Sequence, residues 1–267
     1  MMKLLAILGN PVSHSLSPLL HNSAITALAL QPAVYTRLRI EDGSQLRRIF
    51  ESHGLSGANV TVPHKEAAFE ACDEVCKLAE RIGAVNTIVN EAGRLKGYNT
   101  DAPGFMEAIA PFGHPKRSLI LGAGGTARAI ATIFAQQGLA CTVLNRSSDR
   151  LKPFKAMGVE TATWQSLPKG PFEMVINTTS AGLSDDALPL DRAILQGYLA
   201  SARAAIEVIY GKETPFLKLA NAEGIQTQDG LPMLIHQAAL AFKLFFPAQE
   251  PAQVSTLMYD AATKLRR

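Results

Sequence analysis

The segment "SLILGAGGTARAIATIFAQQGLACTVLNRSSDR", residues 118–150, constrains the fold of this chain more than any other stretch. It reads as strand, glycine turn, helix and strand, and Gly122, Gly124 and Ala127 match the pattern G-x-G-x-x-[GA]. That pattern allows a tight turn and a close approach of the backbone to a pyrophosphate, which the free N–H groups of the first helical turn then face. A glycine-rich turn without a ligand would look the same, but the flanking strand and βαβ length favour a dinucleotide site.

Short β-like runs alternate with helical stretches along most of the chain, at residues 4–8, 34–40, 57–62, 84–89, 118–122, 141–145, 173–179 and 204–210. Strands interleaved with helices predict βαβ units, so we expect an α/β fold with mainly parallel strands in two sheets rather than one. The segment "APFGHPKR" at 110–117 carries two prolines and a glycine and is a candidate domain junction.

The alternation ends near the C-terminus. The run "GLPMLIHQAALAFKLFF" is apolar nearly all round, which predicts a buried helix. A second helix is expected after "PAQEPAQ", ending in Arg266 and Arg267.

The composition and charge of the chain limit the classes of partner that it is expected to bind. The chain has 267 residues, 47 % of them apolar, and its 26 Lys plus Arg against 23 Asp plus Glu give a net charge of +3. This balance does not support nucleic acid or a membrane surface as the main partner. The start "MMKLLAILGNP" is too short for a signal-peptide core or a membrane span, so we expect a cytoplasmic protein. Cys72, Cys76 and Cys141 form no CxxC pair and are interpreted as buried thiols, so no metal site is predicted.

The residues after the second strand of the glycine segment bear on cofactor choice. That strand ends at Asn145, where a site selective for NAD usually has an acid. Arg146, Ser147 and Arg150 follow instead, and such donors suit a 2′-phosphate. Two solvated surface arginines are the alternative, but the pattern favours NADP over NAD. The run "INTTSAGL" at 176–183 follows another strand and is placed either to line the nicotinamide side of the crevice or to serve as an ordinary turn.

The strings "SHSLSP", "GANVTVPHK", "GAVNT" and "GYNTD", together with the glycine turn, "NRSSDR" and "DGLPMLIHQAA", resemble the signature set of shikimate dehydrogenases, in that order and over essentially the whole chain. The resemblance implies NADP-dependent, reversible reduction of 3-dehydroshikimate to shikimate in aromatic amino-acid biosynthesis. It also implies a substrate domain from residues 1–101 and 236–267, a Rossmann-type NADP-binding domain from 102–235, and a monomer or homodimer.

The resemblance assigns the chemistry to Lys65, from the family's "NVTxPxK" element, and to Asp101, from its "NTD" element. Hydride reduction of a ketone builds negative charge on oxygen, and a lysine held by a carboxylate can meet that charge with a proton or as a cation. Whether Lys65 is a proton donor or an electrostatic anchor stays open. His14, His21 and His64 are weaker candidates for a base, because the resemblance gives the proton chemistry to the Lys and Asp.

Further site residues are implied by the same motifs. The substrate-binding set comprises Ser15, Ser17, Thr61, Lys65, Asn86, Asp101, Tyr210 and Gln237. The cofactor-binding set comprises Gly122, Ala123, Gly124, Gly125, Thr126, Ala127, Asn145, Arg146, Ser147, Arg150, Thr178, Thr179, Ser180 and Gly230.

Three serines alternate in "SHSLSP", and in an extended segment Ser13, Ser15 and Ser17 would point to one side. The family's "SxS" falls on Ser15 and Ser17, which implies that these two donate hydrogen bonds to the substrate carboxylate. Ser17 is also a candidate cap for a helix starting at Pro18, and Ser13 is interpreted as a solvated loop residue.

The chain departs from the family in one loop. Where the family usually shows Asp in "D-x-x-Y-x-P-x-x-T-P", this chain has Glu207, and Gly211 and Lys212 follow Tyr210 without the first proline. Alternatives that the sequence leaves open are a quinate-using or NAD-using relative, a non-catalytic shikimate sensor, and an NADP-dependent reductase that shares only the Rossmann half.

Overall fold

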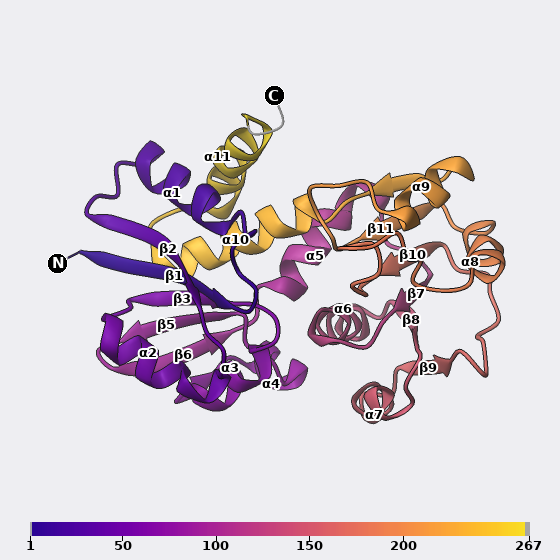
Figure 1. Ribbon diagram of the computed structural model, residues 1–267, viewed down its shortest axis with the longest axis horizontal. Helices are drawn as coiled ribbons and strands as arrows, with labels where there is room; N and C mark the ends of the chain where they lie inside the picture. The colour runs from indigo at the N-terminus through magenta and orange to yellow at the C-terminus, as the bar shows by residue number, and fades with distance from the viewer. Residues whose placement is uncertain (1, 265–267) are drawn as a thin grey trace. The chain divides into compact units, whose positions relative to one another are not determined.

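The computed structural model describes residues 2–264, and the chain divides into two compact units (Figure 1). The first unit combines Met1–Gly104 with Ile235–Arg267, and the second is Phe105–Leu234. The chain therefore changes unit after residues 104 and 234, where the sequence predicted changes after 101 and 235. Each unit contains a six-stranded sheet, and the α/β class is confirmed.

The sheet of the first unit has the order β2-β1-β3-β5-β6-β4. Its strands are β1 (Lys3–Gly9), β2 (Ala33–Arg39), β3 (Gly57–Val60), β4 (Glu74–Val75), β5 (Thr87–Glu91) and β6 (Arg94–Tyr98). β1 pairs in parallel with β2 and β3, but β5 pairs antiparallel with both β3 and β6. The expectation of mainly parallel strands therefore holds, except at β5, which is antiparallel to both of its neighbours.

The reason lies in a two-residue turn between β5 and β6. Ala92 and Gly93 both have positive φ, 53° and 91°. Two consecutive residues with positive φ form the tight connection that joins antiparallel strands in a hairpin. The predicted strand at 84–89 is also shifted, to Thr87–Glu91, because the preceding helix ends only at Gly83 (φ 67°).

Helices cover both faces of this first sheet. They are α1 (Ser17–Ala27), α2 (Leu46–His53), α3 (Lys65–Ala71), α4 (Lys77–Ile82), the start of α5 (Asp101–Ile109), most of α10 (Leu231–Phe245) and α11 (Pro251–Lys264), with a 3-10 turn at Gly43–Gln45. Ala6 and Leu8 of β1 join a core cluster with residues of α2, α3 and α4. On the other face His21 of α1 stacks on Tyr35 of β2, with ring centroids 4.2 Å apart.

The C-terminal helices thus return to the first unit, as the resemblance implied. α10 is the expected apolar helix, and its Ile235, Ala238 and Phe242 are fully buried. Arg266 and Arg267 lie outside the described residues. Within residues 2–264, no helix is long and apolar enough to cross a membrane.

The sheet of the second unit has the order β12-β11-β10-β7-β8-β9, with parallel neighbours. Its strands are β7 (Arg117–Leu121), β8 (Ala140–Asn145), β9 (Glu160–Thr163), β10 (Met174–Asn177), β11 (Ala204–Glu207) and β12 (Gln226–Gln228). Its helices are α6 (Gly125–Gln136), α7 (Lys152–Ala156), α8 (Arg192–Leu199) and α9 (Pro215–Ala222), with 3-10 turns at Ala110–Phe112 and Asp149–Leu151. Counted from β7, the strands lie in the order 3-2-1-4-5-6, which is the Rossmann arrangement.

The cysteines are only partly as expected. Cys141 is buried, but Cys72 and Cys76 are half-buried. Sγ of Cys72 donates to the carbonyl oxygen of Ala68, and burial raises the pKa of both Cys72 and Cys141 to about 12. Sγ of Cys76 instead accepts from the N–H of Ala79 in the first turn of α4.

In the part of the chain that the structure describes, no group of His, Cys, Asp and Glu side chains is arranged to hold a metal ion.

Candidate active site

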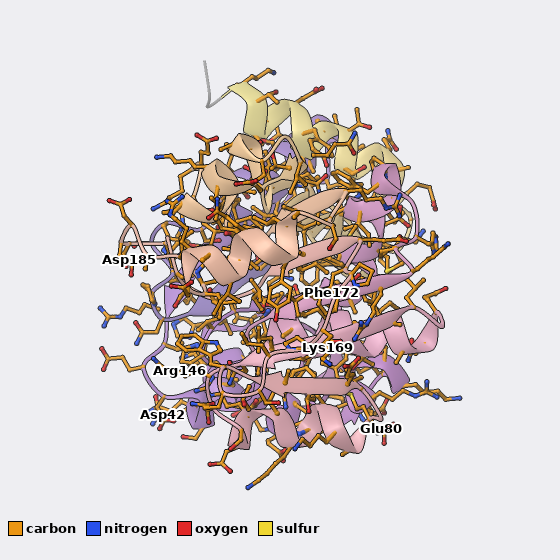
Figure 2. All side chains as sticks on the ribbon, turned by 90° about the vertical axis from the view of Figure 1, so that its right-hand side faces the viewer. Asp42, Glu80, Arg146, Lys169, Phe172 and Asp185 are labelled. Carbon is orange, nitrogen blue, oxygen red and sulfur yellow. The ribbon has the colours of Figure 1, made fainter. Side chains whose placement is uncertain are left out.

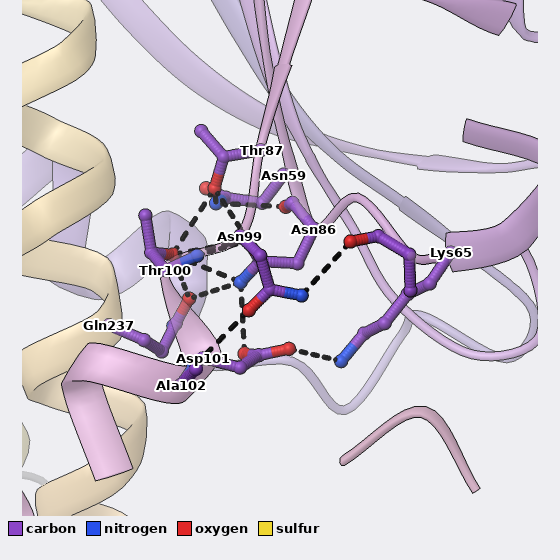
Figure 3. Close-up of polar contacts among 10 residues, drawn as sticks. Asn59, Lys65, Asn86, Thr87, Asn99, Thr100, Asp101, Ala102 and Gln237 are labelled. Atoms are coloured by element: carbon purple, nitrogen blue, oxygen red, sulfur yellow. Dashed lines mark hydrogen bonds and ion pairs between the residues drawn. The ribbon is translucent and has the colours of Figure 1, made fainter. Parts of the chain in front are cut away.

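The first unit places Lys65 and Asp101 in direct contact (Figure 3). Nζ of Lys65 lies 2.6 Å from Oδ2 of Asp101, and the two side chains are 15 % and 10 % exposed. Lys65 is the first residue of α3, and Asp101 is the first residue of α5. Oδ1 of Asn99 accepts the N–H of Ala102 at 3.2 Å, which helps to fix the start of α5. The result is a largely buried ion pair formed by the first residues of two helices.

Asn86 holds the other oxygen of this carboxylate. Its Nδ2 donates to Oδ1 of Asp101 at 2.9 Å, and its Oδ1 accepts the backbone N–H of Thr100 at 2.7 Å. A carboxylate only accepts and a backbone N–H only donates, so these two partners fix the orientation of the amide. Asp101 therefore has one oxygen bonded to an ammonium and the other to an amide, an arrangement that fixes the plane of its carboxylate.

Gln237 of α10 joins the same cluster. Its Oε1 lies 3.4 Å from both Nδ2 of Asn86 and Oγ1 of Thr100. The close approach of α10 requires a glycine on α5, since a Cβ on Gly104 would lie 2.6 Å from the backbone nitrogen of Gln237. Segments distant in sequence thus bring Lys65, Asn86, Asp101 and Gln237 together.

The serine segment differs from its expected geometry. Residues 13–14 form a turn, in which the N–H of Ser15 donates to the carbonyl oxygen of Val12, so the segment is not extended. Ser15 and Ser17 are buried with their Oγ atoms 3.2 Å apart, whereas Ser13 is exposed. α1 begins at Ser17 rather than Pro18, and Oγ of Ser15 accepts the N–H of Ser17. The helix start is therefore held by Ser15, and the capping role predicted for Ser17 is wrong.

Thr61 follows β3 and is half-buried. A Cβ on Gly9, at the end of β1, would lie 2.3 Å from Cγ2 of Thr61, so only glycine allows these two strand ends to approach. Of the three histidines, His14 is exposed, His64 has its Nε2 2.8 Å from the carbonyl oxygen of Ile40, and burial lowers the pKa of His21 to about 3. The contacts of His21 and His64 are those of packed residues.

In the second unit the glycine turn fits a pyrophosphate. Gly122 has φ 101°, and a Cβ there would lie 2.8 Å from Oγ1 of Thr178. Among the described residues, a Cβ on Gly124 would meet no heavy atom within 4 Å, and no side chain caps the start of α6 there. The first turn of a helix has N–H groups without an acceptor inside the helix, and such groups can bind a phosphate. Ala127 is fully buried, which lets α6 pack closely on the sheet.

The segment after β8 presents exposed donors. Nδ2 of Asn145 donates to the carbonyl oxygen of Ser147 at 2.9 Å, which shapes the turn. Arg146, labelled in Figure 2, Ser147 and Arg150 are exposed, and Asp149 is paired with Lys152. These residues fit a ribose 2′-phosphate better than a free 2′-hydroxyl, because guanidinium groups form charge-assisted bonds with phosphate oxygens.

The segment after β10 is a tightly bonded turn. Asn177 is fully buried, and its Oδ1 accepts hydrogen bonds from the backbone N–H and the hydroxyl of Thr179 at 3.1 and 2.8 Å. Oγ1 of Thr178 donates to the carbonyl oxygen of Leu121 at 2.7 Å, so this turn lies against the glycine turn. Asn177 and Thr179 therefore shape this turn, and Thr178 lies beside Gly122.

Comparison with known proteins decides the family. Residues 7–88 match the model described as the shikimate dehydrogenase substrate binding domain. A protein named shikimate dehydrogenase (NADP(+)) from Helicobacter hepaticus is 45 % identical over 247 residues, which span 92 % of this chain and 91 % of the relative. Its counterpart from Helicobacter pylori is 42 % identical over 253 residues, 94 % of this chain and 95 % of the relative. The chain belongs to the shikimate dehydrogenase family.

A solved structure of the family extends the agreement to the fold. Shikimate 5-dehydrogenase from Thermus thermophilus, crystallised in complex with NADP(H) and shikimate, has a TM-score of 0.84 and 37 % identity. The match covers 97 % of this chain and 100 % of that one. The resemblance drawn from the motifs is thus confirmed for the family and for the fold.

The departures from the family's loop pattern begin at Glu207, the last residue of β11. Glu207 is fully buried, and its Oε2 accepts from Nδ2 of Asn177 at 2.8 Å and from the hydroxyl of Thr214 at 3.0 Å. Its Oε1 accepts the N–H of Ile209 at 3.1 Å. Burial raises the pKa of Glu207, and these donors, the Ile209 N–H foremost, partly offset the shift. Gly211 has φ 84°, a conformation that favours glycine.

Tyr210 of the proposed substrate set and Gly230 of the proposed cofactor set belong to the second unit, whereas the other residues of the substrate set lie in the first. Tyr210 is half-buried, and a Cβ on Gly230 would lie 2.1 Å from the carbonyl oxygen of Val208, so that close approach requires glycine. The site residues predicted from the sequence do not include Thr87 or Thr100, although the hydroxyl of Thr87 and the N–H of Thr100 both donate to Oδ1 of Asn86. Their signal was available, because each follows an asparagine within the family motifs "GAVNT" and "GYNTD".

Proposed function

We propose that this chain catalyses the NADP-dependent, reversible reduction of 3-dehydroshikimate to shikimate. The observation that carries the proposal is the Lys65–Asp101 ion pair, oriented by Asn86, in a family member whose Thermus thermophilus relative was crystallised with shikimate and NADP(H). Bound NADPH supplies the hydride at its nicotinamide ring. We further propose a cytoplasmic enzyme that works as a monomer or homodimer, and light scattering would decide between these two states.

Lys65 and Asp101 carry the proton chemistry in this proposal. As hydride reaches the ring carbon, the carbonyl oxygen becomes negative, and the Lys65 ammonium meets that charge by donating a proton or by remaining beside it. Asp101 holds Nζ of Lys65 in place and accepts a hydrogen bond from a ring hydroxyl. Asn86 keeps the Asp101 carboxylate in its plane, and Gln237 offers an amide to a second hydroxyl.

Ser15 and Ser17 are proposed to bind the substrate carboxylate, with Thr61 towards the same group. Ser15→Ala should raise KM for shikimate about tenfold with a smaller change in kcat, because a hydrogen bond to a charged group contributes about 1.5 kcal/mol. Ser13→Ala is the matched control, since Ser13 is the exposed serine of the same segment. Steady-state kinetics of the two variants test this role, and a larger effect at Ser13 would contradict it.

The cofactor is proposed to lie along the glycine turn, with Arg146 and Arg150 towards the 2′-phosphate. Arg146→Ala should raise KM for NADP about tenfold to a hundredfold and leave KM for NAD nearly unchanged, because NAD lacks the phosphate that the guanidinium binds. Lys152→Ala, on the same surface but paired with Asp149, is the control. An unchanged KM for NADP in Arg146→Ala would refute the assignment.

The function itself is tested by following cofactor reduction at 340 nm with shikimate and with quinate, each with NADP and with NAD. We expect kcat/KM to be highest for shikimate with NADP. Preference for quinate or NAD would make the chain a relative with different specificity. Binding of shikimate without turnover of either substrate would indicate a sensor.

A further inference from the structure

Tyr35 is a buried side chain to which the proposed mechanism assigns no role. It lies on β2 of the first unit, is 2 % exposed, and stacks face to face on His21 with an interplanar angle of 4°. The ring fills the core between the sheet and α1, and packing alone would explain a phenylalanine there. The hydroxyl group therefore needs its own explanation.

The hydroxyl of Tyr35 leads towards the catalytic pair. It donates to Oδ1 of Asn59 at 2.7 Å, so Nδ2 of Asn59 faces the other way and donates to Oγ1 of Thr87 at 3.0 Å. Thr87 in turn donates to Oδ1 of Asn86 at 3.1 Å, and Nδ2 of Asn86 donates to Asp101. Figure 3 shows the part of this chain from Asn59 to Asp101. Every link donates in the same direction, and the chain ends on a carboxylate.

The phenol of Tyr35 keeps the proton that this chain needs. Burial raises the pKa of the Tyr35 phenol well above its usual value. The hydroxyl therefore stays protonated and donates to Asn59.

We propose that Tyr35 is a positioning residue whose hydroxyl orients the Asp101 carboxylate through one directional hydrogen-bonded chain. The inference rests on the proposed function, since that function has Asp101 hold Lys65 and meet a ring hydroxyl of the substrate. By donating to Oδ1 of Asn59, the hydroxyl of Tyr35 fixes the amide that donates to Thr87. Thr87 then fixes the amide of Asn86, which holds one oxygen of Asp101.

Tyr35→Phe tests this chain because it removes one oxygen and keeps the ring on His21. Without the phenol, Oδ1 of the buried Asn59 loses its donor, and the amide is free to turn away from Thr87. We expect kcat/KM for shikimate to fall about tenfold while KM for NADP stays within twofold. Thr87→Val should lower kcat/KM on its own, and the double variant of Tyr35→Phe and Thr87→Val should lose less than the product of the two single losses, because both changes break the same chain.

Tyr198→Phe is the matched control, since Tyr198 is 8 % exposed and its hydroxyl also donates one hydrogen bond, to the carbonyl oxygen of Pro168 in the second unit. It should leave kcat/KM for shikimate unchanged even if its melting temperature falls as much as that of Tyr35→Phe. Multiplicative losses in the double variant, or equal rises in KM for shikimate and NADP, would overturn the proposal. Inactivity of the unmodified protein towards shikimate would instead refute the proposed function, and the bond to Asn59 would still be testable from the loss of stability in Tyr35→Phe.

Discussion

Lys65→Ala should lower kcat for shikimate oxidation about a thousandfold while KM for NADP changes less than twofold. A positioned acid or base typically contributes 10²- to 10⁴-fold to the rate, and the methyl group of alanine can neither transfer a proton nor carry charge. The loss should be large because the Lys65 side chain is only 15 % exposed and Asp101 holds its ammonium at 2.6 Å. A water molecule that takes the place of the ammonium carries no positive charge. Stopped-flow and steady-state assays at 340 nm measure the effect.

Lys77→Ala provides a closely matched control. Lys77 is, like Lys65, the first residue of a short helix in the same unit, but it is exposed. Its removal should leave kcat within twofold of the unmodified enzyme. Lys65→Arg separates the two roles left open for the lysine, because arginine keeps the charge but does not release a proton near neutral pH. Near-normal turnover in Lys65→Ala would remove this residue from the mechanism.

Much of the fold could be predicted because the strongest signals are local. The glycines and Ala127 specify a strand, a tight turn and a helix, which determine the Rossmann unit. The hairpin of β5 and β6 was missed because "AG" at 92–93 is a weak turn signal and Ala92 adopts φ 53° only in its tertiary setting. The edge strands β9, "ETAT", and β12, "QTQ", were missed because polar residues at an edge show no apolar alternation.

The candidate site divides in the same way. Lys65, Asn86 and Asp101 could be predicted because each lies in a short motif, and the structure brings them into contact. The hydrogen bonds between motifs could not be predicted from the sequence. The bond from Tyr35 to Asn59, for example, joins residues 24 positions apart and depends on strand register. The same reasoning explains the error at Ser17, where a one-residue difference in the helix start transfers the supporting hydrogen bond to Ser15.

Glu207→Ala should lower the free energy of unfolding by about 3 kcal/mol, because Asn177, Ile209 and Thr214 all lose the acceptor that a buried carboxylate provides. KM for NADP should also rise several-fold. Once Nδ2 of Asn177 is unpaired, its amide no longer needs to present Oδ1 to Thr179, and the turn beside the glycine loop loosens. Urea unfolding and NADP kinetics measure the two effects. Glu213→Ala, which removes an exposed acid of the same loop, should change neither.

Glu207 should also leave a signature in the pH dependence of stability. Burial raises its pKa in the folded state, so between the unfolded value of about 4.5 and the folded value the native state binds more protons than the unfolded chain. The contribution of Glu207 to stability is therefore complete below that interval and decreases as the pH rises through it. Glu207→Gln replaces the carboxyl group with an amide that does not titrate. The free energy of unfolding of this variant should therefore not show the decrease with pH that Glu207 causes. Parallel pH profiles for the two proteins would show that the three donors outweigh burial, so that Glu207 ionises in the folded protein as readily as in the unfolded chain.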